Sequence, residues 1–149
     1  MKHAGKILTL GLFASLAAVS TGALADAVTS RQAAMKEAKK YFKPLVGMVK
    51  GKAPFDATAV RENGAAIAAS LEKARKLFPE GSEKGEKESR AKPEIWMMKD
   101  EFQAAFKTAI QRARALENVK TAKDLTPAVM ALGNDGCGAC HKKFRLPKK

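Results

Sequence analysis

The residues best suited to chemistry lie near the C-terminus, where the chain reads Cys137-Gly138-Ala139-Cys140-His141. This order is the attachment signature of haem c, in which two thiols add to the haem vinyl groups and the neighbouring imidazole binds iron. On a helix, positions i, i+3 and i+4 fall on one side, so both thiols and the imidazole can face one flat ring. The spacing therefore predicts one covalently attached haem c with His141 as an axial iron ligand.

Other uses of two cysteines fit the sequence less well. A structural zinc site needs about four ligands, whereas the chain holds two Cys and two His, and His3 lies in a segment that we expect to be removed. A redox dithiol is expected at the start of a helix that follows a strand, and no strand pattern precedes Cys137. A plain disulfide between Cys137 and Cys140 stays open, but it gives His141 no role.

Residues 1–25 have the features of a secretory signal peptide. Lys2 and Lys6 give a basic start, a mostly apolar run follows from Ile7 to Val19, and Ala23-Leu24-Ala25 is a small-x-small cleavage site. The apolar run is short for a membrane span, which takes about 20 residues; an uncleaved anchor is the alternative. Because bacteria attach haem c outside the cytoplasmic membrane, we expect a cleaved signal, a periplasmic location, no stable membrane insertion and one domain over residues 26–149.

The chain is strongly basic. Its formal net charge of +13 falls to +11 when Lys2 and Lys6 are removed with the signal. Such a surface attracts acidic proteins or anionic lipids, whereas nucleic acid is not an expected partner of an exported protein. Basic residues cluster in two places: Lys36, Lys39, Lys40 and Lys43, then Lys142, Lys143, Arg145, Lys148 and Lys149. The second cluster lies beside the predicted haem, where it could orient an acidic redox partner; a solvated surface that keeps the protein soluble is the alternative.

Helical periodicity recurs four times along the chain, and no strand alternation is convincing. The four segments run over about 28–49, 56–78, 93–116 and from 124 or 126 to 147. Pro44 should kink the first segment, Asp56 is a good N-cap for the second, and Pro93 suits the first turn of the third. The pattern predicts an all-α fold, an antiparallel four-helix bundle with a covalently attached haem between its helices.

Two stretches do not follow this simple pattern. Residues 79–92 form a polar connector that is longer than most loops; we expect it to cross between helices, and the sequence assigns it no role. Gly133, Gly136 and Gly138 would each cost about 1 kcal/mol inside the last helix. Close approach of a bulky flat group to the backbone would explain that cost.

The choice of a second iron ligand is narrow. Without His3, His141 is the sole histidine, so methionine is the strongest remaining candidate. Met130 lies eleven residues before His141 on the same helix and cannot reach round the ring. Met35 lies on the inward stripe of the first helix, where it could bind the iron, pack over the open haem face, or simply fill the core.

Arg31 lies one turn before Met35 in the same inward register. A guanidinium is expensive to bury without a partner, and the two haem propionates would supply one, because arginine pairs well with carboxylates. The alternative is that the Arg31 side chain extends along the helix to reach water.

Taken together, the chain resembles the cytochrome c-prime family, the class II c-type cytochromes, over nearly all of residues 26–149. The haem motif near the C-terminus, after three helices, is the most selective part of the resemblance. The other segments that carry it are Arg31-Gln32-Ala33-Ala34-Met35, Lys50-Gly51-Lys52-Ala53-Pro54-Phe55-Asp56, Phe78-Pro79-Glu80-Gly81, Lys92-Pro93-Glu94-Ile95-Trp96 and the run from Cys137 to Arg145.

The resemblance implies a left-handed four-helix bundle, often a homodimer through the first two helices, with His141 as proximal ligand. It implies that Arg31 contacts a propionate, that Met35 takes the distal position, and that Arg145 is the basic residue beside the proximal face. Members with five-coordinate haem bind nitric oxide or carbon monoxide, whereas a low-spin branch uses a first-helix methionine as sixth ligand and carries electrons.

Our first hypothesis is therefore a high-spin, five-coordinate protein that binds nitric oxide or carbon monoxide, takes part in electron transfer and has Met35 blocking the distal side. The alternative is a low-spin electron carrier with Met35 as sixth ligand. An enzyme such as a peroxidase is not expected, because cleavage of peroxide benefits from a general base, usually a second histidine.

Overall fold

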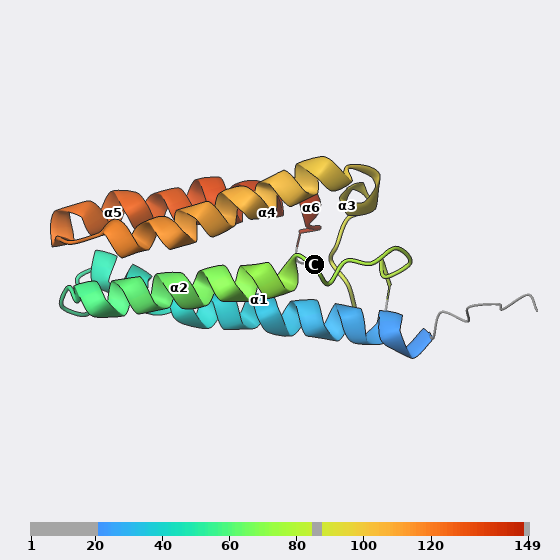
Figure 1. The fold of residues 1–149 in the computed structure, drawn as a ribbon, viewed down its shortest axis with the longest axis horizontal. Helices are drawn as coiled ribbons and strands as arrows, with labels where there is room; N and C mark the ends of the chain where they lie inside the picture. The colour runs from blue at the N-terminus through green and yellow to red at the C-terminus, as the bar shows by residue number, and fades with distance from the viewer. Residues whose placement is uncertain (1–20, 85–87, 148–149) are drawn as a thin grey trace, which may run out of the picture.

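A computed structural model describes residues 21–84 and 88–147 as a bundle of four antiparallel helical rods. The chain runs along α1, returns along α2, runs back through α3 and α4, and returns again through α5 and α6 (Figure 1). Within these residues there is no strand, only an isolated antiparallel bridge between Ala91 and Arg145. The all-α four-helix bundle predicted from the periodicity is confirmed.

The first rod is α1 (Thr21–Val49), which begins seven residues before the expected start and continues through Pro44. The expected cleavage site at residues 23–25 thus lies inside α1, since alanine-rich sequence readily extends a helix; the rest of the expected signal lies outside the described residues. The helix gives way to a turn at Gly51, whose φ of 67° requires the left-handed conformation that glycine tolerates.

The second rod is α2 (Ala57–Ala74), and its predicted N-cap is confirmed. The Asp56 carboxylate accepts hydrogen bonds from the backbone N–H groups of Thr58 and Ala59 at 2.8 and 3.0 Å. The helix ends four residues before the expected boundary at Phe78. Phe78 therefore belongs to the following turn, which brings its ring to the end of the bundle where the connector begins.

The third rod is interrupted, whereas the periodicity predicts one helix over 93–116. Pro93 caps a single turn, α3 (Glu94–Met97), and α4 (Lys99–Arg114) begins only after Met98 has left the helical region. The 3₁₀ turn η1 (Ala115–Asn118) then ends the rod. The Trp96 indole donates a hydrogen bond to the Pro79 carbonyl at 2.8 Å, which joins α3 to the start of the connector.

The fourth rod begins with α5 (Ala122–Ala131), passes through the π-helical segment η2 (Leu132–Gly138) and ends with α6 (Ala139–Phe144). It starts before the expected residues 124 or 126, so Pro127 lies inside α5. It stops at Phe144, before Pro147, because Arg145 turns into the bridge with Ala91. The π segment is not signalled by hydrophobic periodicity, and it lies directly before the predicted haem-binding residues.

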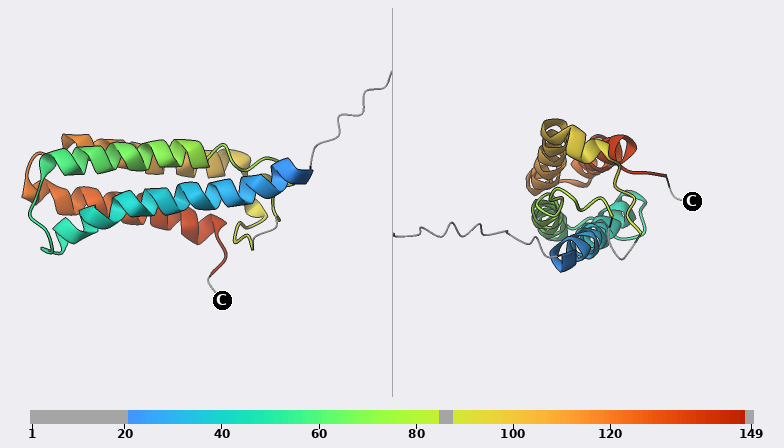
Figure 2. Two further views of the ribbon diagram at one scale, coloured as in Figure 1. Left: turned by 90° about the horizontal axis from the view of Figure 1, so that it is seen from below. Right: turned by 90° about the vertical axis from the view of Figure 1, so that its right-hand side faces the viewer.

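The core lies between the four rods, with α1 packed along α2, α2 along α4, and α4 against η2 (Figure 2). Apolar residues that recur at helical spacing in each rod are buried and form an inward stripe: Val28, Ala38, Leu45, Val60, Ile67, Leu71, Ile95, Phe102, Ala109, Leu116, Val129, Leu132 and Phe144. At Gly64, α2 closely approaches the end of α4 and η1. Among the described residues, no helix is both long and apolar enough to cross a membrane.

We expect Gly64→Ala to destabilise the protein by about 1–3 kcal/mol. A β-carbon at Gly64 would lie 2.8 Å from both the Ala113 carbonyl oxygen and the Leu116 β-carbon, so backbone would have to move. Gly47→Ala is the matched control, because nothing lies within 4 Å of its added β-carbon and alanine favours a helix by about 1 kcal/mol. Urea unfolding of both variants measures the difference; equal stabilities would contradict the tight crossing.

Candidate haem site

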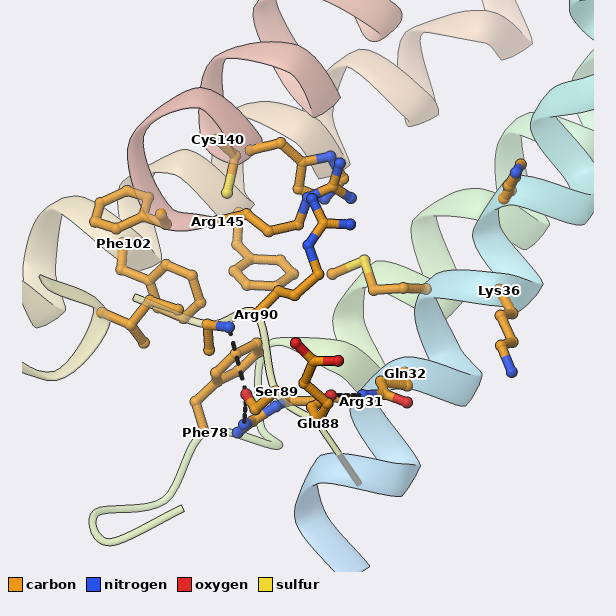
Figure 3. Close-up of a pocket in the computed structure, with 17 residues that line it drawn as sticks. Arg31, Gln32, Lys36, Phe78, Glu88, Ser89, Arg90, Phe102, Cys140 and Arg145 are labelled. Carbon is orange, nitrogen blue, oxygen red and sulfur yellow. Dashed lines mark hydrogen bonds between the residues drawn. The ribbon is translucent and has the colours of Figure 1, made fainter. Parts of the chain in front are cut away.

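Two adjoining cavities lie between α1, α4 and the end of the last rod. The larger, of about 420 Å³, is also lined by the connector, and the smaller, of about 240 Å³, is also lined by α2. Both lie within or near the size range of small-molecule and cofactor pockets. Figure 3 shows the larger one, with Cys140 on α6 facing α1 across it. The residues that line both cavities are Met35, Lys39, Phe106, Cys140, His141 and Arg145.

The inner walls are aromatic and aliphatic. Phe102 lies at the centre of an edge-to-face cluster, with ring centroids 4.8 Å from Phe78, 5.1 Å from Phe106 and 5.1 Å from Phe144. Each of these four rings lines the larger cavity, together with Ile95. Such walls suit a large flat apolar ring, and they shield the bottom of the cavity from water.

Cys137 lies in η2, whereas Cys140 lies one turn later in α6, and both are half-buried free thiols. Burial raises the pKa of Cys137, and burial together with Cys137 raises the pKa of Cys140 to about 11. Redox-active C-x-x-C thiols have a lowered pKa instead. Neither thiol thus has the lowered pKa expected of a redox dithiol, and the two cysteines are not joined in a disulfide.

His141 follows Cys140 and lines both cavities. Burial, together with the positive charges of Arg145 and Arg90, lowers its pKa to about 4. The imidazole is therefore neutral at neutral pH, which is the form that binds a metal. Within the described part of the chain, no three His, Cys, Asp or Glu residues gather closely enough to hold a bare metal ion.

Two glycines of η2 lie so close to other backbone atoms that a larger side chain would not fit easily. A β-carbon on Gly136 would lie 3.2 Å from the Ala109 α-carbon, so this glycine lets α4 approach the last rod. A β-carbon on Gly138 would lie 3.0 Å from the Gly133 carbonyl oxygen in the same π segment. Gly133 and Gly136 also line the smaller cavity, so the expectation that the cofactor approaches these glycines stays a prediction. π segments of this kind often occur at functional sites.

Met35 is half-buried on α1 and lines both cavities. No other methionine lies in the walls of either cavity in the part of the chain that the structure describes. Met97 and Met130 are exposed, at 79% and 50% of their surfaces. Met35 is therefore the methionine that the fold brings to the same space as His141.

Arg31 is buried, with only 4% of its surface exposed, so the alternative in which it extends to water is wrong. One terminal nitrogen donates to the Ser82 hydroxyl at 3.1 Å and to the Leu77 carbonyl at 3.4 Å. The other donates to the Ser82 carbonyl at 2.8 Å and to the Ser89 hydroxyl at 2.9 Å (Figure 3). Burial lowers the pKa of Arg31, while Glu83 raises it.

The central carbon of the Arg31 guanidinium lies over two rings, 4.8 Å from the Phe78 centroid and 5.7 Å from that of Trp96. The terminal N–H groups thus bind Leu77 and the connector, while the cation also contacts aromatic rings. A propionate that reaches Arg31 would share it with Ser82 and Ser89. That role of Arg31 stays a prediction.

The connector, which the sequence left without a role, forms one wall of the larger cavity. Ser89, Arg90 and Ala91 line it. The Arg90 guanidinium donates to the Leu146 carbonyl at 2.6 and 3.0 Å, and backbone hydrogen bonds join Lys92 to Phe144 and Leu146 to Arg90. These contacts fasten the chain after α6 to the connector. Sequence reasoning missed Arg90, because long-range pairing of two loops leaves no periodic signal.

Arg145 is exposed on its outer side and lines both cavities four residues after His141. Burial lowers its pKa, and the nearby Arg90 lowers it further. The structure therefore brings Cys140, His141, Met35, Arg31 and Arg145 to one cavity and Cys137 to the adjoining one. Two thiols, a neutral imidazole and aromatic walls around one space fit a covalently attached haem c.

Comparison with known proteins identifies the family of the chain. Residues 26–145 match the family model described as Cytochrome C'. The chain belongs to the cytochrome c' family. It is 34% identical over 146 residues to cytochrome c' of Rhodopseudomonas palustris, covering 95% of this chain and 98% of that protein. It is 36% identical over 139 residues to cytochrome c-556 of Agrobacterium fabrum, covering 92% of each.

Solved cytochrome c' structures have the same fold. Cytochrome c' of Rhodopseudomonas palustris superposes with a TM-score of 0.78 at 32% identity, covering 83% of this chain and 98% of that one. A nitric oxide complex of a variant cytochrome c prime from Alcaligenes xylosoxidans gives a TM-score of 0.73 at 26% identity, covering 84% and 97%. Relatives of similar identity carry two names, cytochrome c' and cytochrome c-556, so similarity alone does not choose between the two hypotheses.

We expect Arg31→Ala to lower the free energy of unfolding by about 2–4 kcal/mol, because it removes several charged hydrogen bonds and leaves buried carbonyls without donors. Ser89→Ala should cost about 1 kcal/mol, since it removes one of these bonds. Gln32→Ala, beside Arg31 but with a single exposed bond to the Glu88 carbonyl, is the control and should be nearly neutral. Denaturant unfolding checks the order; an Arg31 variant as stable as the Gln32 variant would contradict it.

Proposed function

We propose that this member of the family is an exported haem c protein whose iron is held by His141 and is five-coordinate, with Met35 blocking the distal side. It would bind nitric oxide or carbon monoxide and take part in electron transfer. The observation that carries the proposal is the shared cavity, in which Cys140, a neutral His141 and Met35 line one aromatic space.

When bound, haem supplies an iron centre that exchanges one electron or takes a diatomic gas. Cys137 and Cys140 would hold its edge covalently, so the cofactor stays in place without relying on iron coordination alone. His141 would bind from one side, and its neutral form needs no proton to leave first at neutral pH. The Phe78, Phe102 and Phe106 rings would exclude water from the inner face.

Size selection would come from Met35 and its neighbours on α1. With haem bound, a half-buried methionine that lines both cavities would leave more room for a small ligand than for a bulky one. The nitric oxide complexes solved for the Alcaligenes xylosoxidans protein support gas binding in a protein of this fold. Arg31 and Arg145 are proposed to assist, Arg31 beside a propionate and Arg145 beside the proximal face.

The alternative is a six-coordinate electron carrier in which the Met35 thioether is the sixth ligand. The position of Met35 supports this alternative as well, because no other methionine of the described chain lines the cavities. We propose no catalytic activity under either reading. Among the described residues, His141 is the sole histidine in the cavity walls, so the distal side would lack an imidazole base for peroxide cleavage.

Export and dimerisation complete the proposal. The family match begins at residue 26, directly after the expected cleavage site, which supports a periplasmic mature protein. Ala65 and Ala69 are exposed on α2, and nothing lies within 4 Å of a β-carbon built on Gly47 of α1. These small residues would let a second copy approach closely at the α1–α2 face. Ala34, another small residue of α1, is buried in the core and cannot contact a second copy.

Mass spectrometry tests the attachment and the processing together. Expression with the haem-attachment machinery in the periplasm should give a chain that begins at Asp26 and carries the whole mass of one haem, because thiols add across vinyl groups without loss. The Cys137→Ala, Cys140→Ala double variant should lack that added mass after denaturation. A wild-type chain without covalent haem would refute the proposed function.

Two substitutions of Met35 separate ligation from steric blocking. Met35→Leu keeps the volume but removes the thioether, so a five-coordinate protein should keep its high-spin optical spectrum, whereas a six-coordinate one should change from low-spin to high-spin. Met35→Ala opens the distal side and should speed carbon monoxide binding relative to Met35→Leu. Equal rates for the two variants would show that Met35 does not block the site.

A further inference from the structure

Basic side chains surround the mouth of the haem cavity. Lys36 and Lys39 line it from α1, Arg90 from the connector and Arg145 from the residue after α6. Lys40 and Lys43 extend the α1 lysines along the same side of the helix, since residues three and four apart are neighbours. Lys142 adds a further exposed charge next to His141. We call these seven residues the basic mouth.

The charges of the basic mouth are not neutralised by the protein. Within the described residues, each of the five ion pairs uses other cations, such as Arg75 with Glu72 on α2 and Lys143 with Glu101 on α4. Glu88 is the one carboxylate among the described residues that line the two cavities. Arg90 and Arg145 lie close enough for each guanidinium to act on His141.

This distribution is more specific than a high net charge. Besides the buried Arg31, four cations line the larger cavity, Lys36, Lys39, Arg90 and Arg145, and they face the single carboxylate of Glu88. Like charges gathered with so little counter-charge repel one another, and an acidic partner relieves that repulsion on contact. This local excess of positive charge therefore points to a binding surface at the mouth.

We infer that the basic mouth is the docking surface for an acidic redox protein, which exchanges electrons through the haem edge at this opening; the inference rests on the proposed function. A lipid surface fits less well, because peripheral helices insert large apolar side chains beside their basic ones. The exposed large apolar residues of the described chain are Met97, Met130 and Leu146. None lies on α1 beside the lysines, and Leu146 alone is next to the mouth.

The test is electron transfer between the haem-loaded protein and a flavodoxin, an acidic flavoprotein, in stopped flow. The anionic flavin hydroquinone gives one electron to the ferric haem, which becomes ferrous, and leaves the neutral semiquinone. Lys36→Glu, Lys39→Glu should slow this reaction at low ionic strength by at least about tenfold, and added salt should slow the wild type towards the variant rate. Hexaammineruthenium(II), a cationic one-electron donor, should instead react faster with the variant.

Lys52→Glu, Lys123→Glu is the matched control. Both lysines are exposed and lie at the opposite end of the bundle, in the α1–α2 turn and in the first turn of α5 (Figure 1). This pair lowers the net charge equally, so it should leave the flavodoxin rate within about twofold of wild type.

Three results would overturn the inference: an equal slowing by both pairs, no slowing by either, or a loss of binding to phosphatidylglycerol vesicles by the Lys36, Lys39 variant with an unchanged flavodoxin rate. Each protein is first checked for covalent haem by mass and for its wild-type optical spectrum. A missing haem would refute the proposed function, whereas normal haem with insensitive rates would refute the docking surface alone.

Discussion

The buried guanidinium of Arg31 is the contact on which the shape of the haem cavity depends. Its hydrogen bonds reach the Ser82 and Ser89 hydroxyls and two backbone carbonyls from a single position on α1. A charged group in such a place needs several acceptors to offset its lost hydration, and the connector supplies them. Arg31 thus holds the polar connector in place as one wall of the cavity.

The opposite wall depends on the shape of the last rod. A π segment changes the direction in which later side chains point, because each turn contains more residues than an α-helical turn. Here η2 joins α5, which carries Val129, to α6, which carries Cys140 and His141. Gly136 in η2 allows α4 to approach closely. The aromatic cluster around Phe102 then fills the space that remains between the rods.

The sequence was sufficient where the physical signal is local. Asp56 as a helix cap, the inward stripe that includes Val28 and Leu45, and the haem motif itself follow from spacing and residue type alone. Spacing and residue type do not predict three other features: the helix break at Met98, the π segment, and the hydrogen bonds from Arg90 to the Leu146 carbonyl. They depend on contacts between segments far apart in sequence, which periodicity does not encode.

For Arg31, the sequence predicts the position of the side chain but not its hydrogen-bond partners. The residue lies in an inward register, where a guanidinium needs acceptors, but a serine hydroxyl, a backbone carbonyl or a carboxylate can each serve as one. The fold supplies the first two, and all four terminal N–H positions have an acceptor. A propionate would therefore gain most from Arg31 as a fixed positive charge beside it. Since the connector holds that charge in place, the connector serines would then help to set the electrostatic environment of a bound haem.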